Sequence, residues 1–203
     1  MTKKALILIL FLLCFENSFS QNFQKIFFEI NTKDKLWIIS KPISSLKVKK
    51  VTKEVNSILI GKSNGKFLDQ DLQGGQIDAF RHILLLYKLS SEIGIEKARR
   101  FGNIYESYNK KVFKTTANSG YDYASEMMDK FNNELGIYLF LKMDKVSDIQ
   151  IIDEIKKQII EGNARKISKD GKGRSVGKDF NIIEDSIWKK EWYNQRLLIQ
   201  TNK

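Results

Sequence analysis

The stretch QIDAFRHILLLYKLSSEI, residues 76–93, decides the fold of this 203-residue chain. Its apolar residues recur at the three- and four-residue spacing of an α-helix, and they cover nearly the whole circumference of that helix. A helix that is apolar nearly all round is usually buried. The stretch therefore predicts a central helix that carries Asp78, Arg81 and His82 inside the fold.

Helical patterns continue on both sides of this stretch, whereas the alternation typical of strands is scarce. Pro42 separates the first two segments, and Ser119 and Ser147 are expected to cap the last two. The pattern predicts an all-α fold, a single-domain orthogonal bundle of about six helices. A short apolar element is expected at residues 36–39. The expected helices are residues 43–59, 76–93, 96–109, 120–143 and the segment between Ser147 and Gly162, with loops at 61–75 and 109–119.

The chain divides into three parts. Residues 1–20 are expected to be a signal peptide, residues 21–166 the helical domain, and residues 167–203 a basic loop followed by a C-terminal amphipathic helix. Trp188 and Trp192 carry the last of these predictions, because two tryptophans four residues apart lie on one face of a helix.

The leader has the parts of a secretory signal peptide. Lys3 and Lys4 give a basic start, an apolar run covers residues 5–15, and the small residues Ser18 and Ser20 precede the expected cleavage site. The apolar run is shorter than the roughly 20 residues that a transmembrane helix needs. We expect export to the periplasm or beyond, without a stable membrane anchor.

Composition excludes some chemistry and leaves the partner open. The one cysteine, Cys14, lies in the leader, so the mature chain has no disulfide, thiolate metal site or cysteine nucleophile. The formal net charge of +11 would suit an anionic lipid or glycan. However, lysine, isoleucine and asparagine are abundant throughout the chain, which raises the isoelectric point without any polyanion. We expect no nucleic acid partner for an exported protein, while a protein or an anionic surface stays open.

Polar residues on three predicted helices form the candidate site. Asp78 and His82 lie four residues apart on the central helix, where the carboxylate can orient the imidazole. Asp129 and Asn133 repeat this spacing on a later helix. If such groups converge in a partly dry pocket, their pKa values move apart and one site holds an acid and a base. The candidate catalytic residues are His82, Asp78, Glu106 and Asp129, and the candidate binding residues are Arg81, Asn132 and Asn133.

Two functions from different classes fit these candidates. In a hydrolase-like enzyme, His82 would be the general base, Asp78 would orient it, and Glu106 would be a second acid or base. Arg81 and Asn133 would then stabilise developing negative charge. In a non-catalytic binding or interaction module, the same side chains would bond one another and hold the helices in register, with Arg81 paired to a core carboxylate of another helix.

The same residues resemble a family of small helical bacterial domains whose activity is unsettled. Its pattern runs Asp-Ala-Phe-Arg-His, later His-Glu, and later Met-Asp-Leu-His-Asn-Asn-x-x-Gly. The chain matches this pattern at residues 78–82, Glu106, residues 128–129, residues 132–133 and Gly136, within a resemblance from Trp37 to Lys166. The resemblance implies an all-α domain that occurs in exported proteins and at the ends of large toxin-like chains, with no settled cofactor.

Two departures from this pattern favour the non-catalytic interpretation. Tyr105 and Phe131 stand where the family has histidines, so the chain keeps one imidazole of three. A zinc motif with two histidines four residues apart is also excluded, because the chain has one histidine. The sequence therefore identifies no metal ligands, and it leaves metal dependence and any cofactor open.

Overall fold

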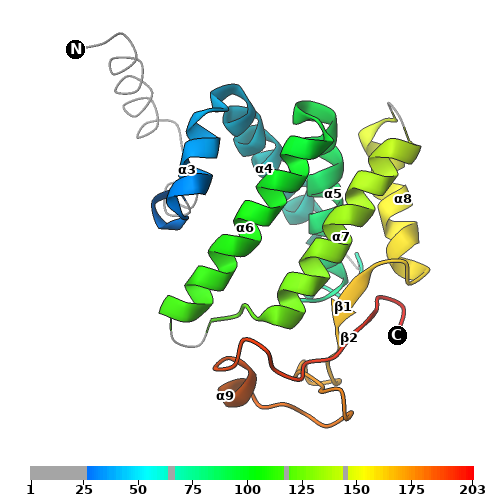
Figure 1. Cartoon of the computed structure of the whole chain (residues 1–203). Helices are drawn as coiled ribbons and strands as arrows, with labels where there is room; N and C mark the ends of the chain where they lie inside the picture. The colour runs from blue at the N-terminus through cyan, green and yellow to red at the C-terminus, as the bar shows by residue number, and fades with distance from the viewer. Residues whose placement is uncertain (1–26, 64–66, 117–118, 144–145) are drawn as a thin grey trace.

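The computed structural model describes residues 27–63, 67–116, 119–143 and 146–203, and it confirms an all-α bundle of about six helices (Figure 1). The helices are α3 (Thr32–Ile39), α4 (Pro42–Ser63), α5 (Gln76–Ile93), α6 (Ile95–Thr115), α7 (Tyr123–Lys142), α8 (Asp148–Ile160) and the one-turn α9 (Asp185–Trp188). Strands β1 (Arg165–Ile167) and β2 (Leu198–Gln200) form a small antiparallel sheet.

Helix α5 is the centre of the bundle, as its sequence predicts. It contacts α4, α6, α7 and α8, and the side chains of Phe80, Ile83 and Leu84 have no exposed surface. Gly94 ends this helix in a left-handed conformation, with φ of +83°, and α6 begins at the next residue. A glycine suits this turn because it adopts positive φ without a steric penalty.

Helices α5 and α7 approach each other so closely that one position must be glycine. A Cβ atom at Gly136 would lie 2.3 Å from the backbone oxygen of Ile83. Asp129 and Asn133 precede Gly136 by seven and three residues, so all three share the face of α7 that meets α5. This contact therefore brings the polar residues of α7 against those of α5.

Two predicted helix boundaries are wrong and one is confirmed. Asp122, not Ser119, caps α7 by accepting a hydrogen bond from the backbone of Ser125. Helix α6 continues to Thr115, through part of the expected loop at 109–119. Ser147 caps α8 as expected, in a capping box with Gln150. Asp122 was overlooked because Ser119 was an equally good cap by residue type, and only the tertiary contacts of Asp122 distinguish the two.

The expected C-terminal amphipathic helix is wrong. The segment after β1 is largely irregular, and α9 is its one helical turn. The two tryptophans do not share a helical face: Trp188 stacks on the Arg196 guanidinium at 3.9 Å, and Trp192 packs edge-on against Phe113 of α6. The segment folds back onto the bundle as expected, but through these separate contacts.

A buried ion pair ties this C-terminal segment to the start of α7. Arg196 donates from Nε and Nη2 to the two carboxylate oxygens of Asp122, each at 2.7 Å, and both side chains are buried. Asn132 adds a second tie, because its amide group both donates to and accepts from the backbone of Arg165 in β1.

None of the described helices is both long and apolar enough to cross a membrane. The leader expected at residues 1–20 lies outside the described residues, so export stays a prediction.

Replacing Gly136 by alanine tests the close approach of α5 and α7. The added Cβ would collide with the Ile83 backbone and force the helices apart, which is expected to lower the free energy of unfolding by about 1–3 kcal/mol. Gly61→Ala is the matched control, because nothing lies within 4 Å of its Cβ position on α4. That variant should be neutral or slightly stabilised in urea unfolding; equal losses in both variants would contradict the close approach.

Replacing Arg196 by methionine tests the ion pair with Asp122. The change leaves a buried carboxylate without its partner, which is expected to cost about 3–5 kcal/mol at neutral pH. Arg174→Met removes an exposed ion pair with Asp170 and should cost about 1 kcal/mol or less. Urea unfolding of both variants gives the comparison.

The same pair predicts a pH dependence. Burial alone would raise the pKa of Asp122, but the bonds from Arg196 hold it below its ordinary value. A carboxyl group with a lowered pKa in the folded state stabilises the fold above its unfolded pKa and loses this effect as pH falls through the folded pKa. The stability difference between Arg196→Met and the parent should therefore be full at neutral pH and shrink below about pH 4. A difference independent of pH would contradict this assignment.

Candidate functional site

A cleft of about 630 Å³ lies between the bundle and the C-terminal segment. This volume is in the range of sites that hold small molecules. Helices α5, α6 and α7 supply one wall, and residues of the C-terminal segment supply the other. The lining includes Asp78, Arg81, Tyr105 and Asp129 from the helices, and Lys169 and Trp188 from the C-terminal segment.

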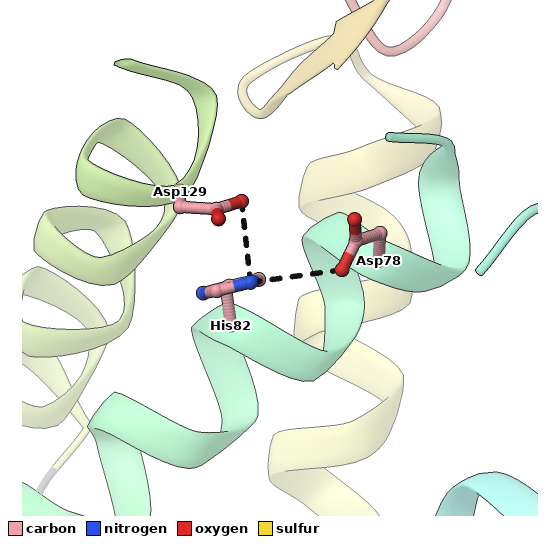
Figure 2. A group of neighbouring side chains, drawn as sticks. All are labelled: Asp78, His82 and Asp129. Atoms are coloured by element: carbon pink, nitrogen blue, oxygen red, sulfur yellow. Dashed lines mark ion pairs between the residues drawn. The ribbon is translucent and has the colours of Figure 1, made fainter. Parts of the chain in front are cut away.

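Asp78, His82 and Asp129 form a compact cluster at the helical wall of this cleft (Figure 2). The Nε2 atom of His82 lies 3.2 Å from Oδ1 of Asp129 and 3.6 Å from Oδ1 of Asp78. All three residues are buried. The sequence brought Asp78 and His82 together by helical spacing, and the contact between α5 and α7 brings Asp129 to them.

Asn133 contacts the imidazole of His82 on the ring nitrogen that faces away from the two aspartates. Its Nδ1 atom lies 3.1 Å from the side-chain oxygen of Asn133, which can only accept, so Nδ1 carries the proton. The Nε2 atom faces Nη2 of Arg81 at 3.4 Å, and because a guanidinium can only donate, Nε2 acts there as an acceptor. Both contacts agree on a neutral ring whose Nε2 lone pair points at the two aspartates.

Asp78 has partners other than His82. One oxygen accepts a hydrogen bond from the backbone of Gly74 at 2.7 Å, and the other accepts one from Arg81 at 2.5 Å. The expected hydrogen bond between His82 and Asp78 is replaced by a longer contact, at 3.6 Å from Nε2 to Oδ1. Arg81 pairs within its own helix, because Asp78 lies one turn before it, whereas the sequence analysis placed its partner on another helix.

Two buried carboxylate oxygens have no hydrogen-bond partner among the described residues. They are Oδ1 of Asp129 and Oε1 of Glu106. Asp129 is 5% exposed and Glu106 is 2% exposed, so water does not surround either group. Because an unsatisfied buried group costs free energy, each such atom calls for an explanation.

Burial shifts the pKa values of these groups. It raises the pKa of Glu106 to about 8, and it raises that of Asp129, where the charges of Glu106 and Asp78 add to the effect. Burial lowers the pKa of His82 to about 4, although the charge of Asp78 acts in the opposite direction. The imidazole is therefore uncharged at neutral pH, in agreement with its contacts.

Glu106 and Asn132 form their hydrogen bonds with residues outside the cluster. Glu106 is buried on α6, and its hydrogen bond is with Asn109 of the same helix. Asn132 donates a hydrogen bond to the backbone of Arg165 in β1. The guanidinium carbon of Arg165 also lies 4.4 Å from the centre of the Phe131 ring. Tyr105, in contrast, lines the cleft.

The sequence did not predict that the C-terminal segment forms the wall of the cleft opposite the cluster. Lys169 and Trp188 come from a segment interpreted as a basic loop and a packing helix, and nothing in their spacing places them opposite α5. The hydrogen bond from the backbone of Gly74 to Asp78 was weakly indicated by the sequence. Consecutive glycines before a helix often adopt positive φ, as Gly74 does at +93°.

Glu106 predicts a second pH dependence. A carboxyl group whose pKa is raised by folding binds its proton more tightly in the folded chain, so stability falls as pH rises from the unfolded pKa to the folded value of about 8. Glu106→Gln removes this effect. The variant should gain stability relative to the parent by up to about 1.4 kcal/mol for each pH unit across that window, measured by urea unfolding. A constant difference would show that Glu106 is ionised throughout.

Of three comparisons with known proteins, one gave a match. No curated protein and no solved structure matches the chain. A family model matches residues 35–163, which is more than half of the chain and includes Asp78, His82, Glu106 and Asp129. The chain belongs to the family described as a domain of unknown function, DUF6973.

Proposed function

We propose that the chain is a hydrolase-like enzyme that acts in the cleft on a small molecule or on the end of a larger one, after export through the leader. The observation that carries the proposal is that two buried carboxyl groups, Asp78 and Asp129, line a cleft with an imidazole directly behind them. Buried polar side chains that serve packing alone are normally satisfied by one another, whereas Oδ1 of Asp129 has no hydrogen bond.

The arrangement can activate water. The carboxylate of Asp129 accepts a proton from a water in the cleft, and the water oxygen forms a bond to a carbonyl carbon or phosphorus of the substrate. The bond to the leaving group then breaks, and the proton passes to that group, so the elements of water are added across the cleaved bond. Arg81 reaches the same cleft with its side chain 36% exposed, and it stabilises the negative charge that develops on the substrate.

His82 has a positioning role in this proposal. It does not line the cleft, and its Nε2 atom lies 3.2 Å from Oδ1 of Asp129, where a proton or cation shared by the two atoms would fix the carboxyl group. The sequence hypothesis made His82 the general base. The placement of the ring behind the carboxyl groups favours Asp129 as the group that meets the water.

The second candidate is the non-catalytic binding or interaction module that the sequence analysis preferred. Its support is structural: Asn133 bonds the imidazole, and Asn132 bonds the backbone of β1, so two of the candidate binding residues hold elements of the fold together. In such a module the cleft would bind a ligand without turning it over.

Substitution of Asp129 distinguishes the two candidates. The assay follows p-nitrophenol release from p-nitrophenyl acetate, p-nitrophenyl phosphate and bis(p-nitrophenyl) phosphate. The parent should hydrolyse at least one of these above the rate in buffer, and Asp129→Asn should lose about 100-fold or more, because it removes the proton acceptor. Glu134→Gln, an exposed carboxylate on the same helix, should keep the parent rate.

Thermal unfolding of each variant accompanies the assay. A folded Asp129→Asn protein that retains the parent rate would refute the catalytic role of Asp129. If none of the three esters is hydrolysed faster than in buffer by the folded parent, the binding module becomes the better description.

A further inference from the structure

We propose that Asp78, His82 and Asp129 bind one divalent transition-metal ion, Zn²⁺ in the first instance, through Oδ1 of each aspartate and Nε2 of the histidine. The sequence identifies no metal ligands, because histidine pairs and thiolates, the usual signals of a zinc site, are absent from the mature chain. The set formed here takes its ligands from two helices that only the fold brings together.

The spacing of the three atoms suits a metal ion. A tetrahedral Zn²⁺ site with ligands about 2.0–2.2 Å from the metal has its ligand atoms about 3.3–3.6 Å from one another. The two contacts of Nε2, at 3.2 Å to Asp129 and 3.6 Å to Asp78, lie close to this separation, and each of the three residues offers one ligand atom within 4.8 Å of the others. The set needs only small side-chain adjustments to surround an ion.

The imidazole is already oriented as a ligand. A histidine that binds a metal usually donates its other ring N–H to an oxygen acceptor, which fixes the tautomer and the ring plane. Nδ1 of His82 has this partner in Asn133, and Nε2 is left with a lone pair that points at the aspartates. A neutral lone pair that faces two carboxylate oxygens is unfavourable unless a proton or a cation lies between them.

The unpartnered oxygen of Asp129 is a second, independent observation. Oδ1 is buried, receives no hydrogen bond, and lies 3.2 Å from Nε2. A cation at this point would give Oδ1 its missing partner. The second oxygen of Asp129 would remain available to take a proton from water, so the site and the proposed chemistry do not compete for one atom.

Two further features define how the ion would sit. Three protein ligands beside a cleft leave a coordination position open, as in catalytic rather than structural zinc sites. Arg81 is the competitor, because its Nη2 atom bonds the same oxygen of Asp78. Its partly exposed side chain can turn toward the cleft, where it meets a substrate. The cation site itself rests on geometry, whereas the activation of water by the ion rests on the proposed function.

The single histidine makes the test direct. Zn²⁺ and, separately, Mn²⁺ are titrated into the untagged, chelator-treated protein by calorimetry, and the imidazole ¹⁵N signals are followed during the Zn²⁺ titration. We expect one Zn²⁺ per chain, a large shift of the Nε2 signal and an unchanged protonated Nδ1. His82→Gln and Asp129→Asn should each weaken Zn²⁺ binding at least tenfold, and Glu134→Gln, the exposed control on α7, should bind like the parent.

The outcomes separate the cation site from the hydrolase proposal. The cation site would be overturned if neither Zn²⁺ nor Mn²⁺ gave a binding heat at millimolar concentration and Zn²⁺ left the Nε2 signal unchanged. Equal binding by parent, His82→Gln and Asp129→Asn would also overturn it. Ester hydrolysis that persists in a chelator would overturn the activation of water by the ion, while the hydrolase proposal would stand. Tight binding at Nε2 without hydrolysis of any ester would keep the cation site and remove the hydrolase proposal.

Discussion

The contact between Gly136 and the backbone of Ile83 is the constraint on which the rest of the structure depends. It sets the distance between α5 and α7, and therefore the distance between His82 on one helix and Asp129 and Asn133 on the other. A larger residue at 136 would separate the imidazole from both of its partners on α7. The glycine at position 136 is thus explained by geometry: it lets two buried helices meet closely enough for their polar side chains to bond.

The cleft depends on a second constraint, which comes from outside the matched domain. Asp122 and Arg196 hold the C-terminal segment against the start of α7, and Trp188 stacks on the same guanidinium. The family match ends at residue 163, so the cluster lies within the family domain while the facing wall of the cleft follows it in the chain. The polar cluster and the surface that faces it are supplied by different parts of the sequence.

The sequence predicted the helices well because their signals are local. The apolar periodicity of residues 76–93 and the capping box at Ser147 are properties of neighbouring residues, and the structure has both. Spacing also placed Asp129 and Asn133 on one face, but it could not state which oxygen meets which nitrogen. The prediction for the C-terminal segment was wrong for the opposite reason. Trp188 and Trp192 have helical spacing, but they contact Arg196 and Phe113 through tertiary structure, and those contacts override the local pattern.

The shifted pKa values of His82 and Asp129 follow from the position of the cluster between the buried core and the cleft. The charge of Asp78 raises the pKa values of Glu106 and Asp129, and Arg81 is the cation that pairs with Asp78. A fully buried group of this kind would be satisfied by protons alone, and it would be inert. Because Asp78 and Asp129 also border the cleft, the positive charge that satisfies them can be exchanged with solvent. An exchangeable proton or cation at a fixed position beside a bound molecule is what distinguishes a reactive site from a structural hydrogen-bond network.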